Sequence, residues 1–204
     1  MHAPSQGIVV GISGASGVIY GLEMLRVLEK LRIDRHLVIT LAGRLNFQLE
    51  TDYSTQDVEK LASFVYEDSN LTAAIASGSF LTGGMVVIPC SIKTLSAIAN
   101  SYSASLLVRA ADVTLKERRP LVLVVRETPL HQGHLELMHR AAAMGAIILP
   151  PMPAFYHKPT SIMDLIHQSI GKALDQVGIE HDLFKRWTGH GRGELSRESL
   201  RVAT

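Results

Sequence analysis

The sequence predicts a single α/β domain in which helices cover both faces of a parallel sheet. Its predicted strands are short, unbroken apolar runs such as Gly84–Pro89 and Leu121–Val125, the composition of strands that are buried on both faces. Segments with helical periodicity separate these runs, as in the repeat of Leu22, Leu25 and Leu28. This alternation is typical of a three-layer, Rossmann- or flavodoxin-like α/β domain with a parallel sheet.

Length and composition agree with one globular domain. The chain has 204 residues, and we expect the domain to span residues 1–180, followed by a C-terminal tail over 181–204 in which glycines and charges alternate. The formal net charge of +1 gives no reason to expect binding to nucleic acid or to a membrane. No apolar run approaches the roughly 18 residues that span a bilayer, and the first residues lack the pattern of a secretory signal. We therefore expect a cytoplasmic protein.

The first half of the chain is predicted to contain three strands and three helices. A strand in Gly7–Ile12 precedes an amphipathic helix whose leucines end at Leu31, with charged residues largely on the opposite side. Tyr66–Gly84 is rich in Ser, Gly and Thr and has no clear period, so we expect a loop with short structured pieces. The remaining elements are a strand over His36–Leu41, a helix over Ala42–Tyr53, a helix capped by Ser54 or Thr55, and the strand Gly84–Pro89.

The second half continues the alternation. Leu106–Arg118 is predicted to be a helix that Pro120 ends, because proline cannot donate a backbone hydrogen bond. Ser161 is placed to cap a last helix that runs to about Val177. The other elements are a turn over Cys90–Thr94, strands over Leu121–Val125 and Ala146–Leu149, a helix over His131–Gly145, and a constrained, proline-rich loop over Pro150–Pro159.

The stretch Ser13-Gly14-Ala15-Ser16-Gly17 joins the first strand to the first helix. A helix N-terminus attracts anions, glycines let the backbone approach a phosphate, and Ser13 and Ser16 could donate hydrogen bonds. The spacing matches neither the dinucleotide pattern nor the Walker pattern. An anion site and a plain turn are therefore equally consistent with these residues.

Polar residues recur at the predicted carboxyl ends of other strands, where ligands of open parallel sheets bind. These ends carry Thr40, Cys90–Thr94, Arg126–Glu127 and Pro150–Tyr156. Arg126 could hold a phosphate or carboxylate in bidentate fashion, and Glu127 in a partly desolvated cleft could act as an acid or base. A surface ion pair between the two is the plainer alternative.

Three further features are open to more than one interpretation. Arg109, Asp112 and Lys116 share one helix face, which is either a solvated surface or a contact that delivers cations into a neighbouring subunit's pocket. Cys90, the only cysteine, is expected to be a buried core thiol rather than a nucleophile. The nine histidines form no HExxH motif and offer no third ligand, so we expect no metal site.

Several motifs in the same order resemble the UbiX family of flavin prenyltransferases, over roughly Gly7 to Trp187. The motifs are Gly14-Ala15-Ser16-Gly17, Glu50-Thr51-Asp52, Pro89-Cys90-Ser91-Ile92-Lys93-Thr94, Arg109-Ala110-Ala111-Asp112-Val113, Leu115-Lys116-Glu117-Arg118-Arg119-Pro120-Leu121-Val122-Leu123, Arg126-Glu127-Thr128-Pro129 and Pro153-Ala154-Phe155-Tyr156-His157.

This resemblance implies a homo-oligomer, of the dodecamer type, that binds FMN and dimethylallyl monophosphate. It implies transfer of the dimethylallyl group to N5 and C6 of reduced FMN, without a metal. The product would be the prenylated FMN that UbiD-type decarboxylases use.

The resemblance also implies roles for individual residues. Glu127 would be the acid or base near the flavin, Ser16 and Glu50 would support the reacting region, and Trp187 would wall the prenyl pocket. The FMN site would be lined by Gly14, Ala15, Ser16, Thr40, Ser91, Ile92, Lys93, Thr94, Arg109 and Arg126. The prenyl phosphate would be held, partly across subunit boundaries, by Lys116, Arg126, Tyr156 and Lys172. Two residues depart from the family: Thr40 replaces serine and is followed by Leu41 instead of lysine, and Lys172 replaces a frequent arginine.

Three alternatives remain open at this point. A flavin-dependent cysteinyl-peptide or phosphopantothenoylcysteine decarboxylase has the same fold, but such enzymes use a histidine and an asparagine-containing motif where this chain has Cys90–Thr94. An accessory FMN carrier would bind flavin without changing it. Direct decarboxylation of aryl acids is the third alternative.

Overall fold

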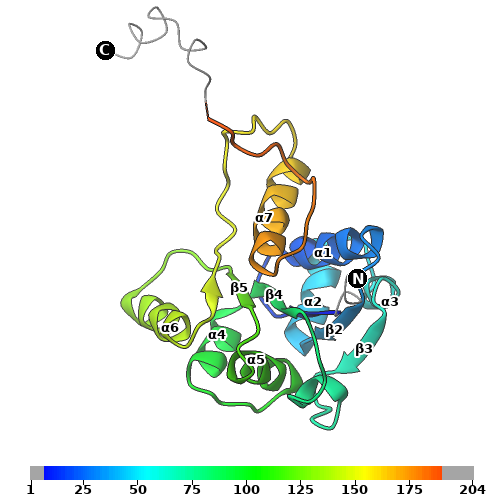
Figure 1. Ribbon diagram of the computed structural model, residues 1–204, viewed down its shortest axis with the longest axis vertical. Coiled ribbons are helices and arrows are strands. Elements are labelled where there is room, and N and C mark those ends of the chain that lie inside the picture. Colours follow the sequence, from blue (N-terminus) through cyan, green and yellow to red (C-terminus); the bar gives the residue numbers. More distant parts are fainter. Residues whose placement is uncertain (1–6, 190–204) are drawn as a thin grey trace, which may run out of the picture.

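The computed structural model describes residues 7–189 and forms one sheet of six parallel strands (Figure 1). The strands are β1 (Ile8–Ile12), β2 (Arg35–Ile39), β3 (Phe64–Glu67), β4 (Gly84–Cys90), β5 (Leu121–Val125) and β6 (Ile147–Ile148). The helices are α1 (Val18–Lys30), α2 (Leu41–Glu50), α3 (Thr55–Glu59), α4 (Ile92–Ala99), α5 (Leu106–Lys116), α6 (Gln132–Ala143) and α7 (Ile162–Gln176), with a short 3-10 turn, η1, at Ala74–Ala76.

The strand order is β3-β2-β1-β4-β5-β6. From β1 the chain proceeds outward through β2 and β3, and then crosses to β4 on the other side of β1. It continues outward through β5 to β6. The direction of winding therefore reverses between β1 and β4, which is the position where doubly wound sheets bind their ligands. The predicted three-layer α/β fold with a parallel sheet is confirmed.

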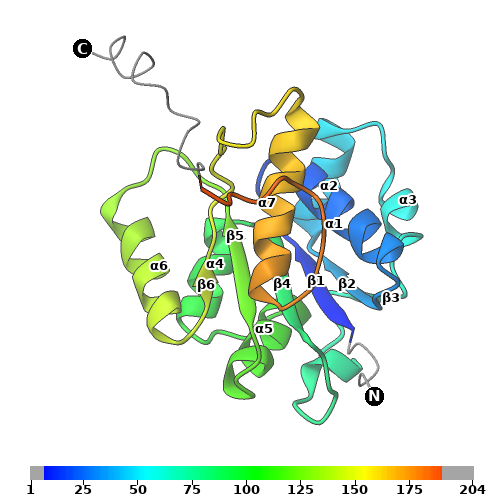
Figure 2. The same cartoon turned by 45° about the horizontal axis from the view of Figure 1, so that its top comes forward.

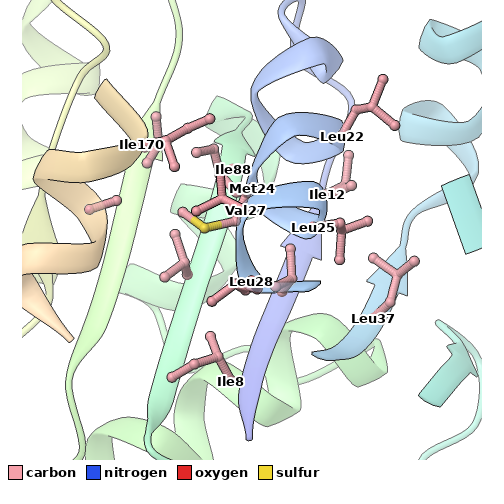
Figure 3. Packing of buried hydrophobic residues seen from close by; sticks show 14 of the residues in the cluster. Ile8, Ile12, Leu22, Met24, Leu25, Val27, Leu28, Leu37, Ile88 and Ile170 are labelled. Atoms are coloured by element: carbon pink, nitrogen blue, oxygen red, sulfur yellow. The ribbon is translucent and has the colours of Figure 1, made fainter. Parts of the chain in front are cut away.

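Helices cover both faces of the sheet because successive strand residues point to opposite sides. Ile8 and Val10 of β1 belong to a core with α1, α2 and α7, whereas Val9 between them belongs to a core with α4 and α5. Figure 3 shows Leu22 of α1 and Ile170 of α7 directed into the first of these cores. The unbroken apolar runs in the sequence follow from this burial on both faces.

Several predicted boundaries are confirmed. The strand at Leu121–Val125 is found with the same bounds. The last helix begins after Ser161, whose Oγ accepts a hydrogen bond from the Asp164 N–H at 3.2 Å, while the Asp164 carboxylate accepts one from the Ser161 N–H at 3.0 Å. This reciprocal capping box fixes the start of α7.

One prediction about local structure is confirmed and two are wrong. Tyr66–Gly84, expected to be a loop with short structured pieces, contains the end of β3 and the 3-10 turn η1. Cys90–Thr94 is not a turn, since α4 begins at Ile92, directly after Ser91. The second strand ends at Ile39, Thr40 caps the next helix, and Leu41 is its first residue.

The described part of the predicted tail, residues 181–189, lies along α7. Figure 2 shows this segment turning back from the C-terminal end of α7 toward the loop that precedes this helix. Residues 190–204 are outside the described residues, and the division of the chain at residue 180 stays a prediction.

Candidate active site at the carboxyl edge of the sheet

The carboxyl ends of the central strands meet at one edge of the sheet and are joined there by backbone hydrogen bonds. The Ser13 N–H donates to the Pro89 carbonyl at 3.1 Å, and the Thr40 N–H donates to the Ile12 carbonyl at 3.0 Å. The segments after β1, β2 and β4 therefore form a continuous rim, which includes most of the residues predicted to line the FMN site.

Ser13 holds two of these segments together. Its side chain is fully buried, its Oγ donates to the Pro89 carbonyl at 3.0 Å, and the same Oγ accepts from the Ser91 N–H at 2.8 Å. The hydroxyl hydrogen is already used within the protein, so the expectation that Ser13 donates to a bound anion is wrong. Sequence analysis missed this structural role because both partners lie at the end of a different strand, β4.

Glu50 occupies part of the N-terminus of α1. Its Oε2 accepts hydrogen bonds from the Gly17 N–H at 2.7 Å and from the Val18 N–H at 3.3 Å. Gly17 has a φ of 99°, in the left-handed region that glycine adopts without strain. The anion that a helix N-terminus attracts is here a carboxylate of the same chain. Its predicted support of the reacting region stays a prediction.

The N-terminus of α4 is more open than that of α1. Ser91 caps this helix, because its Oγ accepts from the Thr94 N–H at 3.2 Å and donates to the Thr94 Oγ1 at 3.1 Å. Among the described residues, the N–H groups of Ile92 and Lys93 have no hydrogen-bond partner. Two free donors and the positive end of the helix dipole therefore point out of this helix, an arrangement that suits an anion.

Arg126 and Glu127 follow β5 and do not pair with each other. The Arg126 Nε donates to the Ser16 carbonyl at 2.9 Å, and the Arg126 N–H donates to the Cys90 carbonyl at 3.1 Å. The terminal nitrogens of this guanidinium make no hydrogen bond within residues 7–189. Glu127 is exposed and accepts only from the neighbouring Thr128 N–H, at 3.0 Å. A positioned cation and a carboxylate thus lie next to the glycine turn, and the surface ion pair considered from sequence is absent from the described residues.

The charged residues predicted to share one face of α5 contact different partners. Arg109 pairs with Asp112 at 2.8 Å and donates through Nε to the Ala76 carbonyl at 3.2 Å. Lys116 pairs instead with its neighbour Glu117.

Lys116 lies far from Arg126 within one chain. Lys116 ends α5 just before the start of β5, whereas Arg126 follows the other end of this five-residue strand. A strand of five residues spans roughly 16 Å, so one chain does not bring the two cations together.

Tyr156, Lys172 and Trp187 lie around α7. The rings of Tyr156 and Trp187 meet edge to face, with 6.1 Å between their centroids. The Lys172 Nζ lies 3.7 Å from Asp175 Oδ2, one helical turn further along α7. Asp175 was missed by sequence analysis, although its i, i+3 spacing from Lys172 was visible there.

The expectation for Cys90 is supported, and the structure adds two findings on other kinds of site. Cys90 is fully buried, and burial raises the pKa of its thiol to about 12, which disfavours a reactive thiolate at neutral pH.

Within residues 7–189, no group of three or more His, Cys, Asp or Glu side chains could hold a metal ion. In the same part of the chain, no helix is long and apolar enough to cross a membrane.

Comparisons with known proteins agree on the family. The flavoprotein family model matches residues 1–173. A flavin prenyltransferase UbiX of Thauera aromatica is 53% identical over 190 residues, which cover 93% of this chain and 98% of that protein.

Two solved structures are similar along almost the whole chain. AnUbiX (PadA1), solved in complex with FMN and dimethylallyl pyrophosphate, has a TM-score of 0.90 and 44% identity, covering 92% of this chain and 100% of the other. A dodecameric FMN-dependent UbiX-like decarboxylase from Escherichia coli O157:H7 has a TM-score of 0.87 and 45% identity, covering 90% and 100%. The chain therefore belongs to the flavoprotein family and, within it, to the flavin prenyltransferases of the UbiX type.

Proposed function

We propose that this chain joins a dimethylallyl group from dimethylallyl monophosphate to N5 and C6 of reduced FMN. The prenylated FMN would then serve a UbiD-type decarboxylase, and we place the reaction in the cytoplasm. The observation that carries the proposal is the arrangement of Arg126, which the Ser16 carbonyl holds beside the glycine turn, with terminal nitrogens that make no hydrogen bond to the described residues. The exposed carboxylate of Glu127, which forms no salt bridge within residues 7–189, follows it directly.

The rim fits an anionic flavin. The free N–H groups of Ile92 and Lys93 would bind its phosphate at the start of α4. Gly14 lies so close to α2 that an added Cβ would overlap the Cβ of Ala42, so the turn can pack against α2 only with a glycine at this position. When bound, reduced FMN supplies the nucleophilic N5 and C6 positions.

The chain's own residues would act mainly on charge and protons. Breaking the bond between the allylic carbon and the phosphate oxygen leaves negative charge on phosphate, which Arg126, Lys172 and Lys116 would stabilise. The ring of Trp187 would stabilise positive charge on the allylic group by cation–π attraction. As the second bond forms, the C=C bond of the transferred group breaks and gains a proton while C6 loses one, and Glu127 would assist this proton transfer.

We further propose that the active form is a homo-oligomer, of the dodecamer type. The placement of Lys116 supports this, because a single chain leaves it at the opposite end of β5 from Arg126. A second copy would have to supply this lysine to the rim.

The test is anaerobic incubation of the protein with reduced FMN and dimethylallyl monophosphate, followed by mass spectrometry of the flavin. We expect a flavin that has gained one dimethylallyl unit. A parallel incubation with dimethylallyl pyrophosphate tests which donor is used. Unmodified flavin that stays bound would instead support an FMN carrier, and loss of carboxylate from an added aryl acid without a UbiD-type partner would support direct decarboxylation. Glu127→Gln and Lys116→Ala should slow transfer while FMN binding is retained.

A further inference from the structure

Asp175 is the centre of the contacts that hold residues 181–189, here called the C-terminal strap, against α7 (Figure 2). The two terminal nitrogens of Arg186 donate to the two oxygens of its carboxylate, at 2.7 and 3.1 Å. This is the bidentate geometry that makes arginine–carboxylate pairs stronger and more directional than single contacts. The Asp175 side chain is only 19% exposed, so solvent screens the pair less than an ordinary surface pair.

His181 adds a second attachment between the strap and the same carboxylate. Its Nδ1 accepts a hydrogen bond from the Leu183 N–H at 3.3 Å, so the neutral ring carries its hydrogen on Nε2. This Nε2 lies 2.8 Å from the Gly171 carbonyl and 3.1 Å from Asp175 Oδ1. The imidazole is 1% exposed. The strap is therefore attached to α7 through the buried ring of His181 as well as through Arg186.

Gly171 of α7 provides the space in which the His181 ring packs against the helix. An added Cβ at this position would lie 2.5 Å from His181 Cε1 and 2.6 Å from Phe184 Cε1. Any side chain at residue 171 would push the strap away from the helix. The strap and the helix surface are thus shaped to each other.

The residues around Asp175 include three that were assigned to the prenyl donor: Tyr156 and Lys172 to its phosphate, and Trp187 to the wall of the prenyl pocket. Trp187 directly follows Arg186, and its ring packs against Tyr156. Lys172 lies one turn before Asp175 on α7, with its ammonium 3.7 Å from the carboxylate. A lysine is a flexible point charge, and a carboxylate one turn away restricts where its ammonium spends time.

We propose that Asp175 is a positioning residue for the prenyl donor, which fixes Lys172 and holds Trp187 against Tyr156. Asp175 does not touch the substrate in this role. The inference rests on the proposed function, because it assumes that these three residues face the donor. The Arg186 guanidinium lowers the pKa of Asp175, so its carboxylate stays charged at neutral pH.

The first experiment uses the single tryptophan of the chain, Trp187, as a reporter that does not depend on turnover. Acrylamide quenching of its fluorescence is measured in Asp175→Asn, in Arg186→Gln and in the matched control Asp182→Asn, an exposed carboxylate of the same strap. We expect quenching to increase by about 1.5-fold in the first two variants, because Trp187, already 58% exposed, leaves its place against Tyr156, and to stay unchanged in the control. Arg186→Gln keeps the test valid if Asp175→Asn does not fold, since the Arg186 side chain is 53% exposed.

The second experiment measures steady-state kinetics at saturating reduced FMN. In Asp175→Asn the KM for the prenyl donor should rise by about tenfold, as expected when the charge-assisted contact between Lys172 and the donor phosphate is lost because Lys172 is no longer held in place. The affinity for FMN should stay within about twofold, because the flavin residues lie on the rim and not on α7. Asp175→Glu should recover part of the donor KM, since it restores the charge.

Two results would overturn the inference. In one, Trp187 is quenched equally in wild type, Asp175→Asn and Arg186→Gln. In the other, Trp187 moves but the donor KM does not change. If the wild-type protein fails to modify flavin, the proposed function fails, and titration of Trp187 fluorescence with dimethylallyl monophosphate then tests donor positioning separately.

Discussion

Replacing Ser13 by alanine tests whether one buried hydroxyl holds together the segments that follow β1 and β4 at the carboxyl edge of the sheet. The substitution removes the hydrogen bonds to the Pro89 carbonyl and from the Ser91 N–H. The Pro89 carbonyl keeps its second partner, the Ser13 N–H at 3.1 Å, so only the Ser91 N–H becomes unpaired. This N–H is part-buried, and leaving it without a partner costs about 2 kcal/mol of unfolding free energy. For a chain of this length, this corresponds to a fall in Tm of about 4–8 °C.

The assay is urea unfolding followed by circular dichroism, together with an FMN titration, at one fixed protein concentration because assembly also contributes to stability. Ser69→Ala is the matched control: Ser69 is exposed, and its hydroxyl makes no hydrogen bond within residues 7–189. We expect the control to behave as wild type and Ser13→Ala to bind FMN more weakly, because Ser91 loses its anchor beside α4. Equal stability of the two variants would refute the reasoning.

Three further predictions address packing, thiol chemistry and acid stability. Gly14→Ala should lose about 1–3 kcal/mol of stability and bind FMN more weakly, because the new methyl group overlaps Ala42; wild-type values in urea unfolding and flavin titration would contradict this. Cys90, with its pKa raised to about 12 by burial, should react slowly with iodoacetamide in the folded protein and readily in urea; rapid labelling of the folded protein would show an accessible thiolate. The backbone and side-chain donors of Thr160 and Ser161 lower the pKa of Asp164 from 3.8 to about 2. The contribution of Asp164 to stability is therefore present above about pH 4 and is lost as the pH falls toward 2. Asp164→Asn should be less stable than wild type near pH 7 but equal to it near pH 2. A difference in stability that is constant across this range would argue against the capping box.

The sequence was sufficient to predict those elements whose signal is local. Leu121–Val125 is apolar at every position because it is buried on both faces, and its bounds were predicted correctly. Ser161 was predicted to cap the last helix, and the structure adds the reciprocal hydrogen bond to Asp164 three residues later, which is also a local contact.

Features that depend on distant partners could not be predicted in this way. β3 is a four-residue edge strand whose apolar residues stay partly exposed, so it is recognised by its pairing with β2 and not by a long buried run like that of β5. The hydroxyl of Ser13 could donate to a ligand or to the protein, and only the neighbouring β4 decides between them. Nothing in the order of residues indicated that Asp175 would meet Arg186 and His181, because the strap must first fold back along α7.

The separation of Lys116 from Arg126 by the length of β5 has a consequence for when the proposed chemistry can occur. Within residues 7–189, a lone chain already places the unbonded N–H groups of α4 and the fixed guanidinium at one edge of the sheet, where we expect them to bind a flavin. It lacks the lysine that would help to stabilise the departing phosphate. Ionisation of the allylic donor would therefore be confined to completed assemblies. An incomplete assembly would store flavin without exposing a reactive allylic cation to water.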